Sequence, residues 1–228
     1  MSAHGCTFRH KMAYDMHDVP LLSGGALSQS AVQVEAFLDE RDSSVKARKS
    51  TDFGGPPVVM RSNDDWYCTS DDLWETGVAD GVTLVVAEHL RAAKLFGAVF
   101  TASQGTPPRF VLRGKIARLE ACRQRELTSE ALVSQMGLIG LAIAATNDVD
   151  YDATVMLEDV RLIDTTTQTT IWQGRAEGTV KGVEPIDAYG KTVFLHTKQA
   201  LRGAVDQLVD QLAKVRVDAT RMPEPAAP

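Results

Sequence analysis

The sequence predicts an α+β fold, an α/β sandwich in which two main amphipathic helices pack on one mixed β-sheet. Residues 109–121 and 151–164 alternate apolar and polar side chains, which is the period of a half-buried strand. Residues 73–96 and 191–215 instead repeat apolar side chains at helical spacing. Since such helices and strands bury their apolar faces best against one another, the pattern favours helices laid on a sheet.

The N-terminal part of the chain is predicted to hold only short strands. Residues 1–30 show no sustained period and are interpreted as a flexible tether. The strand that follows places Val32, Val34 and Ala36 on one side. A Gly-Gly-Pro-Pro stretch then breaks the chain before a short strand expected at 58–60.

The clearest helix is predicted over residues 73–96. Ser70 or Asp71 is positioned to act as its N-cap. Gly77 and Gly81 lower its intrinsic stability by about 1 kcal/mol each relative to alanine. Tertiary packing must therefore hold this helix together.

A hairpin and a second helix follow in the C-terminal half. Within 151–164 the apolar phase changes near Glu158, which predicts a β-bulge. A Thr-rich turn at 164–169 leads into a returning strand, so the two strands form a hairpin. The amphipathic helix at 191–215 comes next, and residues 218–228 fray as a tail.

These elements make up one domain over residues 31–217, with an insertion at about 123–148 between the two long strands. In the first long strand the apolar residues share one face, and Arg113 and Lys115 lie on the opposite face. The sheet is therefore expected to have one apolar and one polar face.

Composition and charge exclude some classes of partner. The 228 residues are 44% hydrophobic and 24% charged, with a formal net charge of −6. Nucleic acid is not an expected partner, because phosphate binding needs clustered Lys and Arg. No apolar run approaches the roughly 18 residues that a membrane-spanning helix needs.

The three cysteines suggest an exported protein. Cys6 follows Gly5, as the first mature cysteine of a bacterial lipoprotein follows a small residue, and it is the candidate lipidation site. The alternative is that Gly5-Cys6 is a chance pair. If Cys6 carries a lipid, Cys68 and Cys122 remain as an even pair and are candidates for a disulfide. The alternative is that they are two unrelated thiols of a cytosolic protein.

Several motifs resemble those of small envelope lipoproteins of Gram-negative bacteria. Leu95-Phe96 closes a helix ahead of a strand with Leu112-Arg113-Gly114, and Leu162–Gly174 gives a hairpin with a Thr-rich turn and Trp-x-Gly. Over residues 31–215 the chain resembles the ABC-transport auxiliary lipoproteins, related to the curli-secretion lipoprotein and the N-terminal fold of the Tol-Pal translocation protein. The resemblance implies a sheet-and-helix fold and lipidation at Cys6.

The insertion contains an apolar segment between Met136 and Ala145 that is too short to span a bilayer. A buried helix or surface cover is one interpretation, and a patch that binds a partner or dips into a membrane is the other. The candidate partner-binding residues of this patch are Met136, Leu138, Ile139, Leu141 and Ile143.

No catalytic signature is recognised. No nucleophile elbow or phosphate-binding Gly-rich loop occurs, and His89 falls on the apolar stripe of its helix, where a packing role is expected. Residues 148–159 fit a calcium loop poorly, because Ala153 stands where Gly is required and Asp159 where Glu belongs. No enzyme activity, cofactor or metal is therefore expected in the domain.

The sequence thus predicts a non-enzymatic periplasmic lipoprotein, anchored to the outer membrane, that serves as an accessory or binding component of an envelope transport or assembly machine. Its expected partners are envelope proteins, including an ABC-type complex, and the membrane through its lipid. The alternative is a periplasmic copper-binding protein that uses His4, His10 and His17 of the tail. An unblocked Ser2-Ala3-His4 end would offer Cu²⁺ a square-planar set of nitrogen ligands.

Overall fold

The computed structural model describes residues 27–47, 59–60, 66–102, 108–124, 148–185 and 191–215, together with the single residue Ala13. The elements along the chain are β1 (Ser28–Val34), β2 (Leu38–Asp39), α1 (Ser43–Lys46), β3 (Val59–Met60), β4 (Trp66–Cys68), the 3₁₀ turn η1 (Asp71–Leu73), α2 (Val78–Ala92), β5 (Phe96–Phe100), β6 (Phe110–Gln124), β7 (Asp148–Asp164), β8 (Thr169–Pro185) and α5 (Lys191–Ala213). Within these segments, no helix combines the length and apolar character needed to cross a bilayer.

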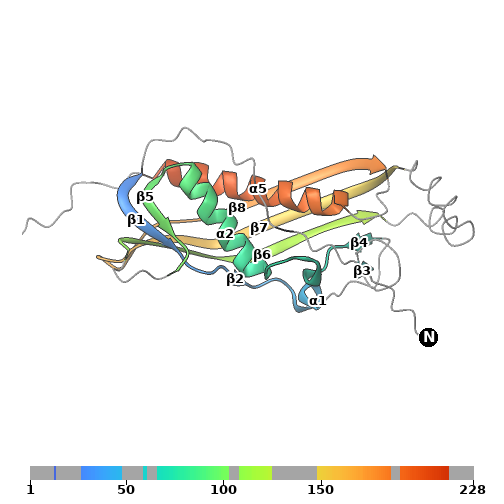
Figure 1. Cartoon of the computed structure of the whole chain (residues 1–228), viewed down its shortest axis with the longest axis horizontal. Helices are drawn as coiled ribbons and strands as arrows, with labels where there is room; N and C mark the ends of the chain where they lie inside the picture. Colours follow the sequence, from blue (N-terminus) through green and yellow to red (C-terminus); the bar gives the residue numbers. More distant parts are fainter. Residues whose placement is uncertain are drawn as a thin grey trace, which may run out of the picture.

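One eight-stranded mixed sheet organises the molecule, and the long strand β6 joins its parts. β7 pairs antiparallel along one edge of β6, and β8 pairs antiparallel with β7. The other edge of β6 is shared by β1 and β2, which run parallel to it, and by β4, which runs antiparallel. β5 extends the sheet beyond β1, and β3 extends it beyond β4. Figure 1 shows α2 and α5 laid on this sheet, which confirms the predicted α+β fold.

The core lies between the helices and the face of the sheet that they cover. Side chains at alternate strand positions point to this face, and each helix contributes one apolar stripe. The largest fully buried side chains are Phe37, Phe110, Phe194, Leu90, Leu95, Leu112, Ile116, Leu119, Leu157, Leu162, Leu201 and Leu208. Burying one such side chain contributes roughly 1.5–3 kcal/mol, so this layer is the main source of stability.

The predicted β-bulge is present in β7. Leu157 and Val160 both face the core, although strict alternation would put them on opposite faces. The register with β8 shifts between these two residues, and Asp159 has a positive φ of 49°. Asp tolerates this left-handed conformation better than most residues because its short side chain can bond locally.

The start of the first long helix differs from the prediction. α2 begins directly after Gly77, which is its N-cap, and not at Ser70 or Asp71. Asp71 instead opens η1, and its carboxylate accepts a hydrogen bond of 2.6 Å from the Arg41 guanidinium. The backbone is extended again at Trp74, so this tertiary ion pair and the extended segment separate the 3₁₀ turn from the helix.

The first strand also has different bounds from those predicted. β1 begins at Ser28, inside the segment interpreted as a tether, and it ends at Val34, so Ala36 is exposed. Phe37 then turns into the core, where its N–H donates a hydrogen bond of 3.0 Å to Thr83 Oγ1 of α2. This buried bond ties the link between β1 and β2 to the helix layer.

α5 lies on β8 with its backbone almost in contact with the strand. A Cβ added to Gly178 would overlap the carbonyl oxygen of Ala200 and lie 2.5 Å from the backbone nitrogen of Ala204. On the helix side, a Cβ on Gly203 would lie 3.6 Å from Gly178 Cα. Glycine at 178 is therefore what allows this close approach.

Candidate functional site

A groove of about 260 Å³ lies where β6 runs between two irregular stretches, the β1–β2 link on one side and the bulge of β7 on the other. Strand alternation in β6 places Arg113 and Lys115 on the face of the sheet away from the helices. The lining residues are Glu35, Ala36, Leu38, Arg113, Gly114, Lys115, Asp159 and Arg161.

Gly114 shapes the floor of the groove. A Cβ at this position would lie 2.7 Å from Phe37 Cε1 and 2.9 Å from Val160 Cγ2, closer than real side chains approach. The β6 backbone can therefore settle between these two core side chains only because residue 114 has none. Both neighbours of β6 are irregular at this level, and the groove opens above the strand as a result.

The charges of the groove are only partly paired. Arg161 Nη2 lies 2.7 Å from Asp159 Oδ1, and Lys115 Nζ lies 3.0 Å from Glu40 Oε1. Arg113 stands directly opposite Arg161 in the strand register. Like charges in this position are unfavourable by a few tenths of a kcal/mol, up to about 1 kcal/mol. In the described part of the chain, the Arg113 side chain has no hydrogen bond or ion pair that would offset this cost.

The groove offers donors, an acceptor and an apolar rim. The Arg113 guanidinium can hold a carboxylate through two parallel hydrogen bonds. Across the groove, the exposed Glu35 can accept hydrogen bonds, and Leu38 has 60% of its surface in solvent. Mixed polar and apolar groups of this kind suit recognition of a polypeptide segment.

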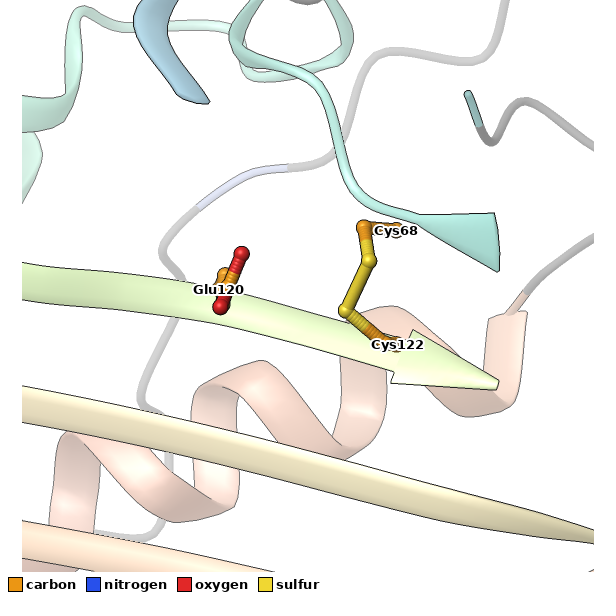
Figure 2. A group of neighbouring side chains, drawn as sticks. All are labelled: Cys68, Glu120 and Cys122. Carbon is orange, nitrogen blue, oxygen red and sulfur yellow. A yellow bond between two sulfur atoms is a disulfide. The ribbon is translucent and has the colours of Figure 1, made fainter. Parts of the chain in front are cut away.

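The predicted cysteine pair comes together at the far end of β6. Cys68 of β4 and Cys122 of β6 are direct partners in the antiparallel register, with Cα atoms 4.0 Å apart, and their sulfur atoms are joined as a disulfide. Figure 2 shows the disulfide and, close by, Glu120, which lies on β6 like Cys122. All three side chains are buried.

The outer edge of β8 is half covered by side chains of α5. Gln207 Oε1 accepts a hydrogen bond of 2.6 Å from the backbone N–H of Glu177, and Gln211 Nε2 donates one of 3.0 Å to the carbonyl of Arg175. No comparable side chain of the described segments bonds the stretch 179–183. Residues 179–183 are therefore a part of this edge along which an extended partner segment could pair with the sheet.

The two described histidines are packed away from the groove. His89 is buried between α2 and α5, with Nδ1 3.0 Å from Asp206 Oδ1, in the packing position that its helical stripe predicts. His196 of α5 stands edge-on to Tyr151, and its Nε2 lies 2.9 Å from Glu184 Oε1.

A buried ion cluster supports the segment between the groove and the disulfide. The Arg41 guanidinium bonds the carboxylates of Asp39 and Asp71 and the carbonyl of Leu119. Burial alone would lower the pKa of Arg41, but the two carboxylates raise it above its usual value. Arg41 therefore stays charged, and its hydrogen bonds connect β2, η1 and β6.

Several predicted site residues lie outside the described part of the chain. These are the lipidation candidate Cys6, the tail histidines His4, His10 and His17, and the apolar patch of Met136, Leu138, Ile139, Leu141 and Ile143. The acids of the poor calcium template lie on the extended strand β7, where Asp152 pairs with Lys181 at 3.3 Å. The groove was not predicted, although the phase change at Glu158 was a signal for the bulge that forms it.

Comparison with known proteins gives no family assignment. No protein-family model and no curated protein matches the chain. A Xanthomonas campestris protein of the DUF330 family is 12% identical, with a TM-score of 0.42 over 86% of this chain and 89% of that chain. A Caulobacter crescentus protein proposed to be a lipoprotein is 15% identical, with a TM-score of 0.30 over 58% of this chain and 80% of that chain.

A further structure, a proposed Helicobacter pylori homologue of a neuraminyllactose-binding hemagglutinin, is 10% identical, with a TM-score of 0.46 over 89% of this chain and 95% of that chain. Similarity of this extent leaves function to be argued from the residues of the chain itself.

Proposed function

We propose that this protein is a non-enzymatic binding component of the Gram-negative cell envelope, held in the periplasm at the outer membrane by a lipid on Cys6. The observation that carries the proposal is the buried pairing of Cys68 with Cys122. Disulfides form and persist in oxidising compartments such as the periplasm and are rare in the cytosol. The resemblance of the helix and hairpin motifs to auxiliary lipoproteins agrees with this compartment.

The groove supplies the binding surface in this proposal. Arg113 and Glu35 are exposed without side-chain partners among the described residues, so a bound segment can pair with both. Leu38 adds an apolar contact at the rim. The partner is a protein of an envelope transport or assembly machine, with an extended segment that carries an acidic side chain for Arg113.

The test is the intact mass of the protein isolated from its native cells without reductant, after free thiols have been alkylated. The expected mass shows an acyl modification on Cys6 and no alkylation of Cys68 or Cys122. Membrane fractionation should place this form with the outer membrane. The lack of alkylation at Cys68 and Cys122 is the part of this result that is specific to an oxidising compartment, because free thiols would react.

A matched control is the Cys6→Ser variant. It should lose the acyl mass and leave the membrane fraction, yet keep the disulfide, because residues 68 and 122 pair within the folded domain. A wild-type chain with three alkylated thiols and no acyl group would contradict the proposal and return the protein to a reducing compartment.

A further inference from the structure

The surroundings of the disulfide contain the atoms of a metal site. The sulfur atoms of Cys68 and Cys122 and a carboxylate oxygen of Glu120 all lie within 4.8 Å of one another. Glu120 is 5% exposed, Cys122 is 6% exposed, and Cys68 has no exposed surface. Two thiols and a carboxylate at this spacing match the ligand types of a four-coordinate Zn²⁺ site with one open position.

A second observation points to the same place. The Oγ of Ser70 is buried and has no hydrogen-bond partner, with the residue 1% exposed. The ladder between β4 and β6 continues past Cys68, because the Thr69 N–H bonds the carbonyl of Ala121. One more step in this register places Ser70 opposite Glu120, on the same face as the cysteines. A buried hydroxyl of this kind is expected to have a partner, and a metal-bound water would provide one.

We propose that the reduced form of the protein binds one Zn²⁺ through Cys68, Cys122 and Glu120, with a water in the fourth position. Arg118 Nη2 lies 3.0 Å from Glu120 Oε1, which orients the carboxylate as outer partners of metal ligands do. Two thiolates and one carboxylate carry three negative charges. The ion neutralises two of these charges, and the half-exposed Arg118 guanidinium pairs with the carboxylate.

The metal site can form only after the disulfide has been reduced. A dithiol reductant breaks the bond between the two sulfur atoms by supplying two electrons and two protons, and it closes to its own disulfide. Zn²⁺ then forms two bonds to sulfur, and the two thiol protons pass to solvent. The oxidised protein cannot bind the ion in this way because both sulfur atoms are already bonded to each other.

The experiment uses the full chain with Cys6→Ser, so that no third thiol takes part. The protein is reduced under nitrogen, freed of reductant and titrated with Co²⁺, whose bonds to thiolate absorb in the near ultraviolet. One equivalent of Co²⁺ should saturate this absorption, and one equivalent of Zn²⁺ should abolish it. The oxidised protein should give no absorption.

Glu120→Gln tests the carboxylate as a ligand. It should weaken Zn²⁺ binding by about 10- to 100-fold or more, since even outer partners of metal ligands contribute that much. Glu158→Gln is the matched control, because Glu158 is an exposed acid on β7 outside the cluster, and it should bind like the parent. Unchanged affinity in Glu120→Gln would overturn the site.

Reduction of the disulfide could unfold the chain, so circular dichroism is recorded on the reduced protein with and without Zn²⁺. A reduced chain that unfolds should regain its native spectrum when Zn²⁺ is added, because metal binding then adds to folding stability. A reduced chain that stays folded should show the cobalt absorption directly. If neither the absorption nor a Zn²⁺-dependent return of structure is seen, the proposal is wrong.

Discussion

At the scale of single residues, His89 shows how burial sets a protonation state. The side chain is 2% exposed, and burial lowers its pKa below the ordinary value of 6.5, because the imidazolium form would lose its hydration. The nearby Asp206 carboxylate acts in the opposite direction without prevailing. The folded protein therefore holds His89 neutral at pH 7.

This lowered pKa predicts a loss of stability in weak acid. Well above pH 6.5 the histidine is neutral in both the folded and the unfolded chain. As the pH falls through 6.5, the unfolded chain binds a proton more readily than the folded chain does. The free energy of unfolding therefore decreases as the pH falls through this value. Urea unfolding at pH values between about 7.5 and 5.5 should show this slope. In His89→Gln the slope should be smaller, and an unchanged slope in this variant would contradict the prediction.

The sequence alone could place His89 but not its partner. Helical spacing puts it on the buried stripe, as the structure has it. Asp206 lies 117 residues further along the chain, on a helix whose crossing with α2 depends on how both pack on the sheet. The hydrophobic pattern of one helix carries no information about which residue of another helix it will contact.

At the scale of elements, the contact between α5 and β8 is controlled by Gly178. Gly178→Ala should destabilise the protein by about 1–3 kcal/mol, because the added methyl group would force the helix away from the strand. Chemical denaturation measures the change. Gly182→Ala is the matched control on the same strand, since its Cβ would meet nothing closer than His196 Cε1 at 3.8 Å. Equal effects of the two substitutions would contradict this account.

Element identity was predicted well where local pattern and tertiary packing agree. The two long strands, the hairpin and the helix at 191–215 have periods that match their burial, and the phase change in β7 revealed its bulge. The start of α2 was wrong because Asp71 has a tertiary partner, Arg41, that no local cap signal includes.

At the scale of the whole molecule, the disulfide between Cys68 and Cys122 joins two distant parts of the described chain. The two residues are separated by 54 positions, so the link should stabilise the fold by about 4 kcal/mol through the lost entropy of the unfolded chain. Reductant, with a chelator present to exclude metal, should lower the free energy of unfolding by up to this amount. The Cys68→Ser/Cys122→Ser variant should be insensitive to reductant, and an equal response in both proteins would contradict the prediction.

The groove could not have been predicted from the sequence as a site. Its residues come from three separate segments, around Glu35, Arg113 and Asp159, that only the register of β6 with its neighbours brings together. Alternation predicted that Arg113 and Lys115 lie on the polar face, which the structure confirms. It did not predict that Arg161 would stand opposite Arg113, because a bulge shifts the register there.

The half-covered edge of β8 has a kinetic consequence. A strand that joins the sheet beside 179–183 can form only a short ladder before it meets the glutamines of α5. Each backbone hydrogen bond contributes about 1 kcal/mol net, so a contact of this size has a fast dissociation rate. The edge is therefore suited to short-lived contacts, and the two glutamines interrupt it as a template for pairing with a second strand.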